Sequence, residues 1–460
     1  MHLRMPQRTL QVLIGCSLLF ALPGDAASLA ATPPMGWNSW DAYGLTIDEP
    51  QFRANAEVLA GLKSYGWNYA VIDEGWYLAN PLAKPADFKY SWDSNGRLIP
   101  DSTRFPSAVN GAGFKPLAGW VHGKGLKFGI HIVRGIPRGV VKENLPVANS
   151  RFLAADVADT GDTCPWDAGN YGVRDTPAGQ AYYDSVIGLY ARWGVDFLKV
   201  DCISDHPYKA DEIRMIATAI HKSGRPIVLS LSPGPTNLSH AAEVAQNSQM
   251  WRIADDIWDG WAFPGQTFPN GLLSAFDNLA KWAKYAKRGN WPDADMLPWG
   301  SLTPHPGWGP PRQSRLTHDE QRTQFALWAM ARSPLILGAD LTRLDDFTRS
   351  LLTDREVIAI DQWAAVSEEI PGSPEDAPRI RVWTATAAST VTTWPGPHAA
   401  WLAVFNLQDS EVRRDIPWPP ALAGKKDAIF DIGNGGRVVP AETVHVKLPP
   451  HGCALFRIEK

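Results

Sequence analysis

Short apolar runs alternate along residues 32–341 with longer segments in which apolar residues recur every three or four positions. The runs are typical of buried strands, and the longer segments are typical of amphipathic helices. The predicted strands are 34–40, 69–73, 127–132, 197–201, 226–232, 250–256, 290–297 and 335–341, and the predicted helices lie near 50–65, 115–124, 177–194, 208–223, 238–247, 272–287 and 318–332. Eight strands that alternate with helices over about 310 residues predict a (β/α)8 TIM barrel. An open doubly wound sheet is disfavoured because no glycine-rich phosphate loop follows any strand.

The pattern changes in the last part of the chain. Residues 379–460 show short alternating runs broken by Pro and Gly, which predict a C-terminal antiparallel β-sandwich. We therefore expect a catalytic barrel over residues 32–371, a boundary at Gly372–Pro378 and a sandwich domain over residues 379–460. No candidate catalytic pair stands out in the sandwich, so we expect it to serve packing and stability.

Residues 1–31 differ from the rest of the chain. Arg4 and Arg8 give the chain a positively charged start. An apolar run from Leu10 to Leu22 comes next, and small residues follow it. This order is typical of a secretory signal peptide, and the run is too short to span a membrane. We expect export to the periplasm or the exterior. A lipid anchor on Cys16 is disfavoured because the apolar run continues past it, and no later run is long enough for a membrane span.

Charge and cysteine content exclude several classes of partner. The chain has 44 Lys and Arg against 48 Asp and Glu, a net charge of −4, with no basic stripe for nucleic acid. No Cys and His cluster has zinc spacing, so we expect no metal, and we expect no other cofactor. Without residues 1–31, Cys164, Cys202 and Cys453 remain, which allows one disulfide and leaves one thiol. The 21 Trp suit sugar stacking and core packing equally well.

Acidic residues follow four of the predicted strands. In a barrel, the carboxyl ends of the strands carry the chemistry. A single Asp after a strand is usually a helix N-cap, but four such ends interleaved with Trp indicate a cleft for sugar hydroxyls and glycosidase chemistry by a carboxylate pair. The candidates are Asp73 and Glu74, Asp201, Asp255 and Asp256, and Asp293 and Asp295, with Trp37, Trp40 and Asp41 from the first strand.

Two cations accompany these acids. Lys199 is two residues before Asp201 and therefore on the same face of its strand, where its charge would keep Asp201 ionised. Arg252 is placed to clamp a sugar hydroxyl. Asp255 and Asp256 alternate faces, so only one of them points into the cleft. A buried ion pair inside the barrel is the alternative role for Lys199 and Asp201, and the residues alone leave the catalytic pair open.

Several motifs occur in the order found in one family. The chain resembles glycoside hydrolase family 27, the melibiases or α-galactosidases, from about residue 32 to the C-terminus. The matching segments are 32–40 (TPPMGWNSW), 197–201 (FLKVD), 251–257 (WRIADDI), 291–297 (WPDADML) and 326–335. Each motif alone is moderately specific, and the ordered set is specific.

The resemblance implies a retaining mechanism through a covalent glycosyl-enzyme, with Asp201 as nucleophile and Asp256 as acid/base. Their carboxyl groups are then expected about 5–5.5 Å apart. It also implies a carbohydrate substrate as the partner, and nothing in the pattern points to an oligomeric state. The substrate-binding residues that we expect are Trp40, Asp73, Glu74, His131, Lys199, Ser232 and Arg252.

The chain departs from the family pattern at four places. Glu74 stands where the family has Asp, His131 replaces a Tyr, and the segment 230–232 (SLS) replaces a Cys-Glu-Trp that contacts the C2 hydroxyl. Cys202 comes one residue earlier than the family's bridging cysteine. The resemblance still implies a bridge between Cys164 and Cys202.

The change at Glu74 affects the expected substrate. Glu is one methylene longer than Asp, so its carboxylate would crowd the hydroxymethyl group of galactose, which L-arabinopyranose lacks. We predict an α-galactosidase, with β-L-arabinopyranosidase, an isomaltodextranase-like glucan hydrolase and an inactive carbohydrate-binding protein as alternatives. An aldolase is disfavoured because Asp201 would keep Lys199, the only Schiff-base candidate, protonated.

Overall fold

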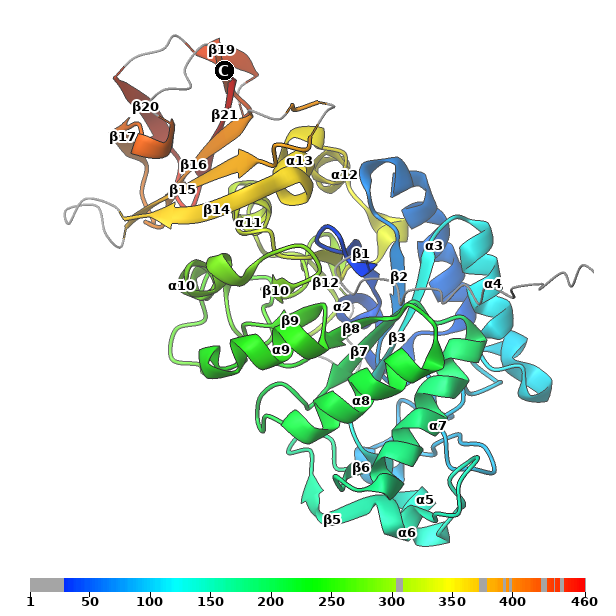
Figure 1. Cartoon of the computed structure of the whole chain (residues 1–460). Helices are drawn as coiled ribbons and strands as arrows, with labels where there is room; N and C mark the ends of the chain where they lie inside the picture. The colour runs from blue at the N-terminus through cyan, green and yellow to red at the C-terminus, as the bar shows by residue number, and fades with distance from the viewer. Residues whose placement is uncertain are drawn as a thin grey trace, which may run out of the picture.

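The computed structural model describes residues 29–302, 309–371, 379–391, 394–396, 399–422, 428–433, 435–438 and 442–459. Eight parallel strands form one sheet in the order β10-β9-β8-β7-β3-β2-β1-β13 (Figure 1). The strands are β1 (Met35–Asn38), β2 (Tyr69–Ile72), β3 (Lys127–Val133), β7 (Phe197–Asp201), β8 (Val228–Leu231), β9 (Met250–Arg252), β10 (Trp291–Asp293) and β13 (Leu335–Leu337). A parallel bridge between Leu297 and Leu337 joins the two ends of the sheet and closes the barrel. The predicted (β/α)8 barrel is confirmed.

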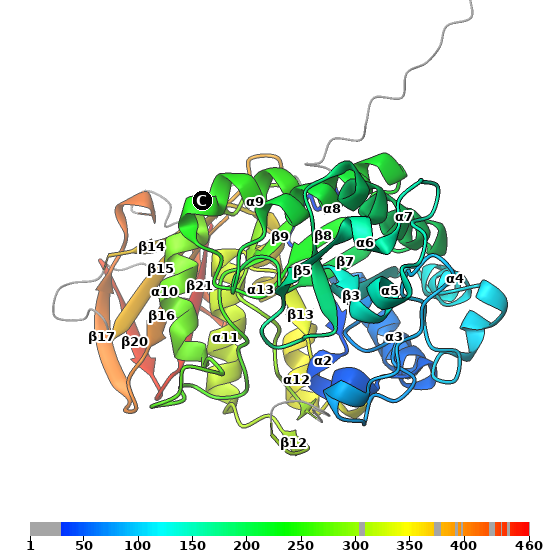
Figure 2. The ribbon, with the colours of Figure 1, turned by 90° about the horizontal axis from the view of Figure 1, so that it is seen from below.

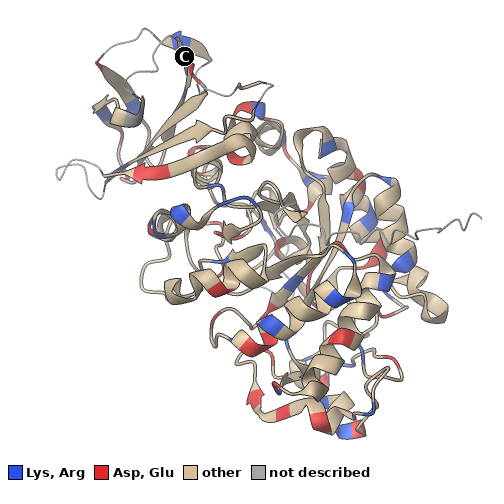
Figure 3. Cartoon of the chain, in the orientation of Figure 1, with Lys and Arg blue, Asp and Glu red and all other residues tan. Residues whose placement is uncertain are grey.

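Helices cover the outside of the barrel at the positions that the periodicity predicts. They are α3 (Glu49–Leu62), α4 (Lys115–Gly123), α7 (Pro177–Trp193), α8 (Ala210–Ser223), α9 (Ala241–Asn247), α10 (Leu272–Trp282) and α11 (His318–Ala331), with α2 (Trp40–Tyr43), α12 (Asp346–Leu352) and α13 (Arg355–Trp363) beside them. Local signals fix several starts: the Asp48 side chain accepts from the Gln51 N–H to cap α3, and Thr317 caps α11 in the same way. Figure 3 shows Lys and Arg interspersed with Asp and Glu over these helices.

Most tryptophans in the described part of the chain lie in the core. Thirteen are buried, and nine of these are fully buried: Trp37, Trp67, Trp76, Trp251, Trp291, Trp299, Trp328, Trp383 and Trp401. The barrel strands approach one another closely beside them, and a Cβ on Gly36 would lie 2.2 Å from the carbonyl oxygen of Tyr69. Only glycine fits at that position. The high Trp content therefore reflects packing more than sugar binding.

The long connection between β3 and β7 carries a small sheet that the sequence did not predict. Its strands are β4 (Ile136–Pro137), β5 (Ala158–Thr163) and β6 (Asn170–Val173), in the order β4-β6-β5, with α5 (Arg138–Glu143) and α6 (Ala154–Val157) in the same connection. The strands are short and polar; β5 reads ADTGDT and is mostly exposed. Such a segment has no apolar periodicity for a sequence pattern to detect.

The C-terminal part forms two antiparallel sheets, which confirms the predicted sandwich (Figure 2). One has the order β14-β15-β16-β21-β18-β19 and the other pairs β17 with β20. Their strands are β14 (Ala364–Ile370), β15 (Ile380–Ala387), β16 (Ala400–Asn406), β17 (Val412–Pro417), β18 (Ala428–Asp431), β19 (Gly436–Val438), β20 (Thr443–Leu448) and β21 (Cys453–Glu459). Both views place this part at one side of the barrel, where α11 contacts β16 and β21.

Two boundaries differ from the sequence-based ranges. The strand β14 lies within the range 32–371 assigned to the barrel, yet it pairs with β15 in the C-terminal sheet; the expected boundary at 372–378 is outside the described residues. Its exposed polar positions hide it from a hydrophobic pattern. Ala30, which we placed in the segment outside the fold, is buried, and its carbonyl accepts a hydrogen bond of 2.8 Å from the Trp291 indole. In the described part of the chain, no helix has the length and apolar character needed to cross a membrane.

Candidate active site

A cavity of about 1090 Å³ opens at the carboxyl ends of the barrel strands. Asp73 and Glu74 after β2, Lys199 and Asp201 from β7, and Asp256 after β9 all line it. The barrel thus collects around one cavity residues that are far apart in the sequence, from Trp40 to Met296. The remaining wall comes from loops, described below.

The surroundings of Asp201 stabilise its negatively charged form. Its Oδ1 accepts a hydrogen bond of 2.5 Å from the Cys202 N–H, and its Oδ2 lies 3.5 Å from His131 Nε2. Burial alone would raise the pKa of Asp201, but His131, Lys199 and the Cys202 N–H together hold it below the ordinary value. The carboxylate is therefore ionised at neutral pH, as a nucleophile requires.

Asp73 forms a buried pair with Lys199. The Asp73 Oδ2 lies 2.9 Å from Lys199 Nζ and also accepts from the Asn38 side chain at 2.6 Å. Burial opposes ionisation of both groups, but their mutual attraction wins: the pKa of Asp73 lies below and that of Lys199 above the ordinary value. A fixed carboxylate beside a fixed ammonium can accept from one sugar hydroxyl and donate to its neighbour.

Arg252 forms ion pairs with two carboxylates, Asp256 and Asp295. It is 3% exposed, with NH2 at 3.2 Å from Asp256 Oδ1 and NH1 at 2.9 Å from Asp295 Oδ1. Burial raises the pKa of Asp295 to about 7, helped by the charges of Asp256 and Asp293 and opposed by Arg252. Asp255 points elsewhere: its Oδ2 lies 3.6 Å from His206. Of the Asp doublet, Asp256 is the member that lines the cavity.

Glu74 faces a second acidic residue that sequence reasoning missed. Asp167, in the loop between β5 and β6, lines the same cavity as Glu74, and its Oδ1 accepts from the Gly169 N–H at 2.7 Å. Burial raises the pKa of Asp167 as well. Burial, the Asp167 charge and the charges of Asp201 and Asp73 raise the pKa of Glu74, so the pair retains a proton more strongly than isolated carboxyl groups.

The expected site residues divide into two groups. Trp40, Asp73, Glu74, Lys199, Asp201 and Asp256 line the cavity. His131 and Arg252 lie behind it and contact its carboxylates, while Ser232 and Arg252 line a separate pocket of about 20 Å³. Ser232 is 2% exposed and its backbone bonds to Val200 and Ile203, so its surroundings are those of a structural residue.

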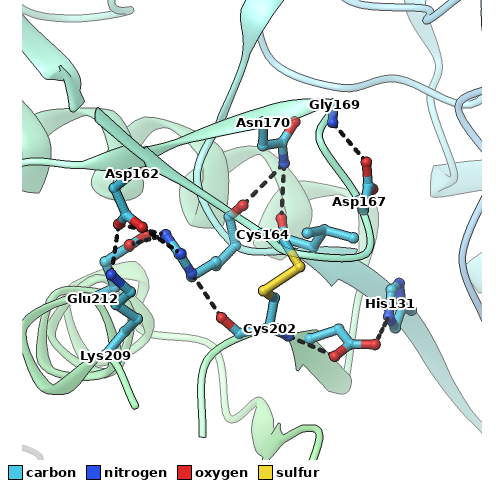
Figure 4. Close-up of a disulfide and its surroundings, with 12 residues drawn as sticks. His131, Asp162, Cys164, Asp167, Gly169, Asn170, Cys202, Lys209 and Glu212 are labelled. Carbon is cyan, nitrogen blue, oxygen red and sulfur yellow. Dashed lines mark hydrogen bonds and ion pairs between the residues drawn. A yellow bond between two sulfur atoms is a disulfide. The ribbon is translucent and has the colours of Figure 1, made fainter. Parts of the chain in front are cut away.

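The disulfide between Cys164 and Cys202 is confirmed, with Cα atoms 6.0 Å apart. It ties the loop that carries Asp167 to the residue after Asp201. Figure 4 shows the bridge between His131 on one side and a cluster of Asp162, Lys209 and Glu212 on the other. Among the described residues, no group of three or more His, Cys, Asp or Glu side chains is arranged to hold a metal ion.

Residues 32–138 and 152–363 match the family model described as alpha galactosidase A (Melibiase_2). The chain belongs to this family. Consistent with that, an alpha-galactosidase A from Cellvibrio japonicus is 32% identical over 97% of this chain and 98% of its own length. Human alpha-galactosidase A is 30% identical over 79% of this chain and 75% of its own. The protein is a glycosidase.

A solved structure resembles this glycosidase over nearly its whole length. The family 27 β-L-arabinopyranosidase from Geobacillus stearothermophilus, in complex with arabinose, is 39% identical and superposes with a TM-score of 0.87, covering 95% of this chain and 99% of that one. The similarity includes both the barrel and the C-terminal sheets. All of helix α5 after its first residue, Arg138, lies in the stretch 139–151 that the family model leaves unmatched.

Proposed function

We propose that this protein is a retaining glycoside hydrolase that releases terminal α-linked D-galactose, with Asp201 as nucleophile and Asp256 as acid/base. The observation that carries the proposal is that these two carboxyl groups line one cavity in different environments. Asp201 is held ionised by His131 and Lys199, whereas the Asp256 side chain is 36% exposed and can exchange protons with water.

The mechanism follows from these environments. Asp201 attacks the anomeric carbon while Asp256 gives a proton to the glycosidic oxygen, so the leaving sugar departs neutral and a glycosyl ester forms on Asp201. Asp256, now a carboxylate beside Arg252, then removes a proton from water, which attacks the ester and frees the sugar with retained configuration. Lys199 and Asp73 hold the sugar hydroxyls in both steps.

A second candidate, β-L-arabinopyranosidase activity, is favoured by Glu74. This residue lines the cavity next to Asp73, where a longer side chain leaves less room for the hydroxymethyl group of galactose. The similarity to the Geobacillus stearothermophilus enzyme over 95% of the chain supports the same candidate. The two sugars share ring stereochemistry, so the proposed roles of Asp201 and Asp256 hold for both.

The deciding experiment is a paired initial-rate assay of the purified protein on an aryl α-D-galactopyranoside and the matching aryl β-L-arabinopyranoside. A higher kcat/KM on the galactoside supports galactose release. A higher kcat/KM on the arabinoside supports the second candidate, and turnover of neither with detectable sugar binding indicates an inactive carbohydrate-binding protein.

We further propose that the protein is exported after removal of its N-terminal segment, to the periplasm or the exterior. The Cys164–Cys202 disulfide supports this, because such bonds persist in oxidising compartments. Since Ala30 packs against Trp291, cleavage before Leu29 would keep that contact. N-terminal sequencing of the mature protein tests the site of cleavage.

A further inference from the structure

The cavity extends well beyond the proposed catalytic carboxylates. Its volume of about 1090 Å³ is at the upper end of pockets that enclose a small molecule, so it has room for more than one sugar ring. Its outer wall comes from three segments: residues 83–92 after β2, residues 137–142, which include nearly all of α5, and residues 166–169 between β5 and β6.

This outer wall carries a net positive charge, whereas most charged residues of the inner wall are acids. Besides Lys199, the cations that line the cavity are Lys89, Arg138 and Lys142, all on the outer segments, where Asp167 is the one acid that lines it. In the part of the chain that the structure describes, none of these three side chains forms an ion pair. The Arg138 Nε is in addition buried without a hydrogen-bond partner. Unpaired cations at a cavity wall attract an anionic ligand.

Aromatic rings lie among these cations. Trp92 and Trp166 line the same outer wall, and Trp166 is 49% exposed. Trp92 lies against Gly139, where a Cβ would approach its ring to 2.4 Å, so the glycine next to Arg138 lets the indole come close. Exposed indole faces in a cavity are suited to the apolar faces of sugar rings.

The three segments are held against one another. β4 pairs with β6 through Ile136 and Tyr171, and the Arg138 N–H donates to the Gly169 carbonyl at 2.9 Å. The Arg138 guanidinium lies 4.7 Å from the Tyr171 ring centroid. A guanidinium fixed in this way loses little freedom when it binds a carboxylate or sulfate, because its donors are already oriented.

We propose that Lys89, Trp92, Arg138, Lys142 and Trp166 form a subsite, the cationic subsite, for a leaving-group sugar that carries a negative charge. The charge is a uronate carboxylate or a sulfate ester, which present the same anionic oxygens to Arg138. This inference rests on the proposed function, because the sugar in the subsite is the one released when Asp256 protonates the glycosidic oxygen. Lys142 lies in the stretch that the family model leaves unmatched.

The test compares three disaccharides that carry the glycon favoured in the paired assay, linked to the same hydroxyl of glucose, glucuronate or glucose sulfate. We expect kcat/KM to be about tenfold higher for an acidic disaccharide than for the neutral one, as for one charge-assisted contact. The advantage should shrink when NaCl rises from about 0.05 to about 0.5 M, because salt screens exposed charges. The larger of the two acidic rates identifies carboxylate or sulfate as the ligand.

Substitutions locate the effect. Arg138→Gln and Lys142→Gln should each lower the ratio of acidic to neutral kcat/KM by about threefold or more. Lys281→Gln is the matched control, because Lys281 is an exposed lysine in the last turn of α10, as Lys142 is in the last turn of α5, and it lies outside the cavity lining. Melting temperatures of the variants exclude misfolding.

Two failures are distinguishable. Hydrolysis of the neutral disaccharide with a ratio near one, or a ratio that Arg138→Gln and Lys142→Gln leave unchanged, overturns the cationic subsite and leaves the proposed function intact. Absence of turnover on every disaccharide and on both aryl glycosides overturns the proposed function, and the subsite falls with it.

Discussion

Shortening Glu74 by one methylene tests whether this side chain decides if the glycosidase accepts a hydroxymethyl group on C5 of the sugar. In the Glu74→Asp variant the carboxylate withdraws from the cavity wall next to Asp73 and moves away from Asp167. The hydroxymethyl group of galactose then gains space, whereas arabinopyranose, which lacks that group, loses a neighbour. The ratio of kcat/KM for the galactoside to that for the arabinoside should rise.

The expected size of the change follows from the volume involved. One methylene in a closed sugar subsite is worth about 1–3 kcal/mol of discrimination, which corresponds to about 10–200-fold in the ratio. Glu74 is only partly buried, so we expect the lower half of that range. The ratio cancels errors in enzyme concentration and in the active fraction, because both substrates are measured on one preparation.

Glu74→Gln is the control that separates length from charge. Glutamine keeps the chain length and can donate a hydrogen bond to Asp167, so the ratio should stay within about twofold of the unsubstituted protein if size alone sets the preference. A Glu74→Asp ratio that does not move, or that moves toward the arabinoside, would refute the steric argument. A Glu74→Gln ratio that moves as far as Glu74→Asp would show that charge decides.

Three further outcomes are expected. Asp201→Ala and Asp256→Ala should each lower kcat on an activated aryl glycoside by about 10³-fold or more while the circular dichroism spectrum stays folded; near-normal turnover would remove that residue from the mechanism. Asp167→Asn removes a negative charge that, after burial, raises the pKa of Glu74. A carboxyl group whose pKa is raised by folding makes the folded protein less stable as the pH rises, so the variant should gain more in melting temperature at pH 8 than at pH 5. Replacing Cys164 and Cys202 by Ser, which opens a loop of 38 residues, should cost about 4 kcal/mol in urea unfolding, and a loss below about 1 kcal/mol would contradict the loop-entropy argument.

The parts of the fold that sequence analysis predicts are those with regular packing. Nearly all positions of the barrel strands are buried, so each strand leaves an apolar run, and the helices α7 and α8 leave an amphipathic one. The small sheet β4-β6-β5 is missed because its strands are short and β5 carries four polar or charged side chains among its six residues, with only one of the six buried. β14 escapes for the same reason, since Glu368 and Glu369 break its apolar pattern.

The site residues differ in the same way: those on or next to strands could be predicted, and the one on a loop could not. Asp73, Asp201 and Asp256 could be chosen from the sequence because each follows or ends a strand, and Lys199 because it lies two residues before Asp201 on the same strand face. A closed barrel brings strand ends together whatever the sequence distance. Asp167 could not be chosen, because its position depends on a disulfide and on a loop whose course no periodicity records. The physical rule is that regular elements predict which side chains converge, while loops require the folded backbone.

In this glycosidase, the residues proposed for bond cleavage and those proposed to bind the leaving-group sugar lie on different kinds of element. The groups proposed for bond cleavage are fixed by strands in the barrel core, where changing one side chain disturbs several buried partners, as the Lys199 and Asp73 pair shows. The outer wall, with Arg138, Trp166 and Lys142, stands on α5 and on the loop before β6, and not on the strand that carries Lys199 and Asp201. Under the proposed cationic subsite, substitutions there should alter which leaving-group sugar is accepted without moving Asp201. Specificity for the leaving group is then set in the connections between strands, while the strands set the chemistry.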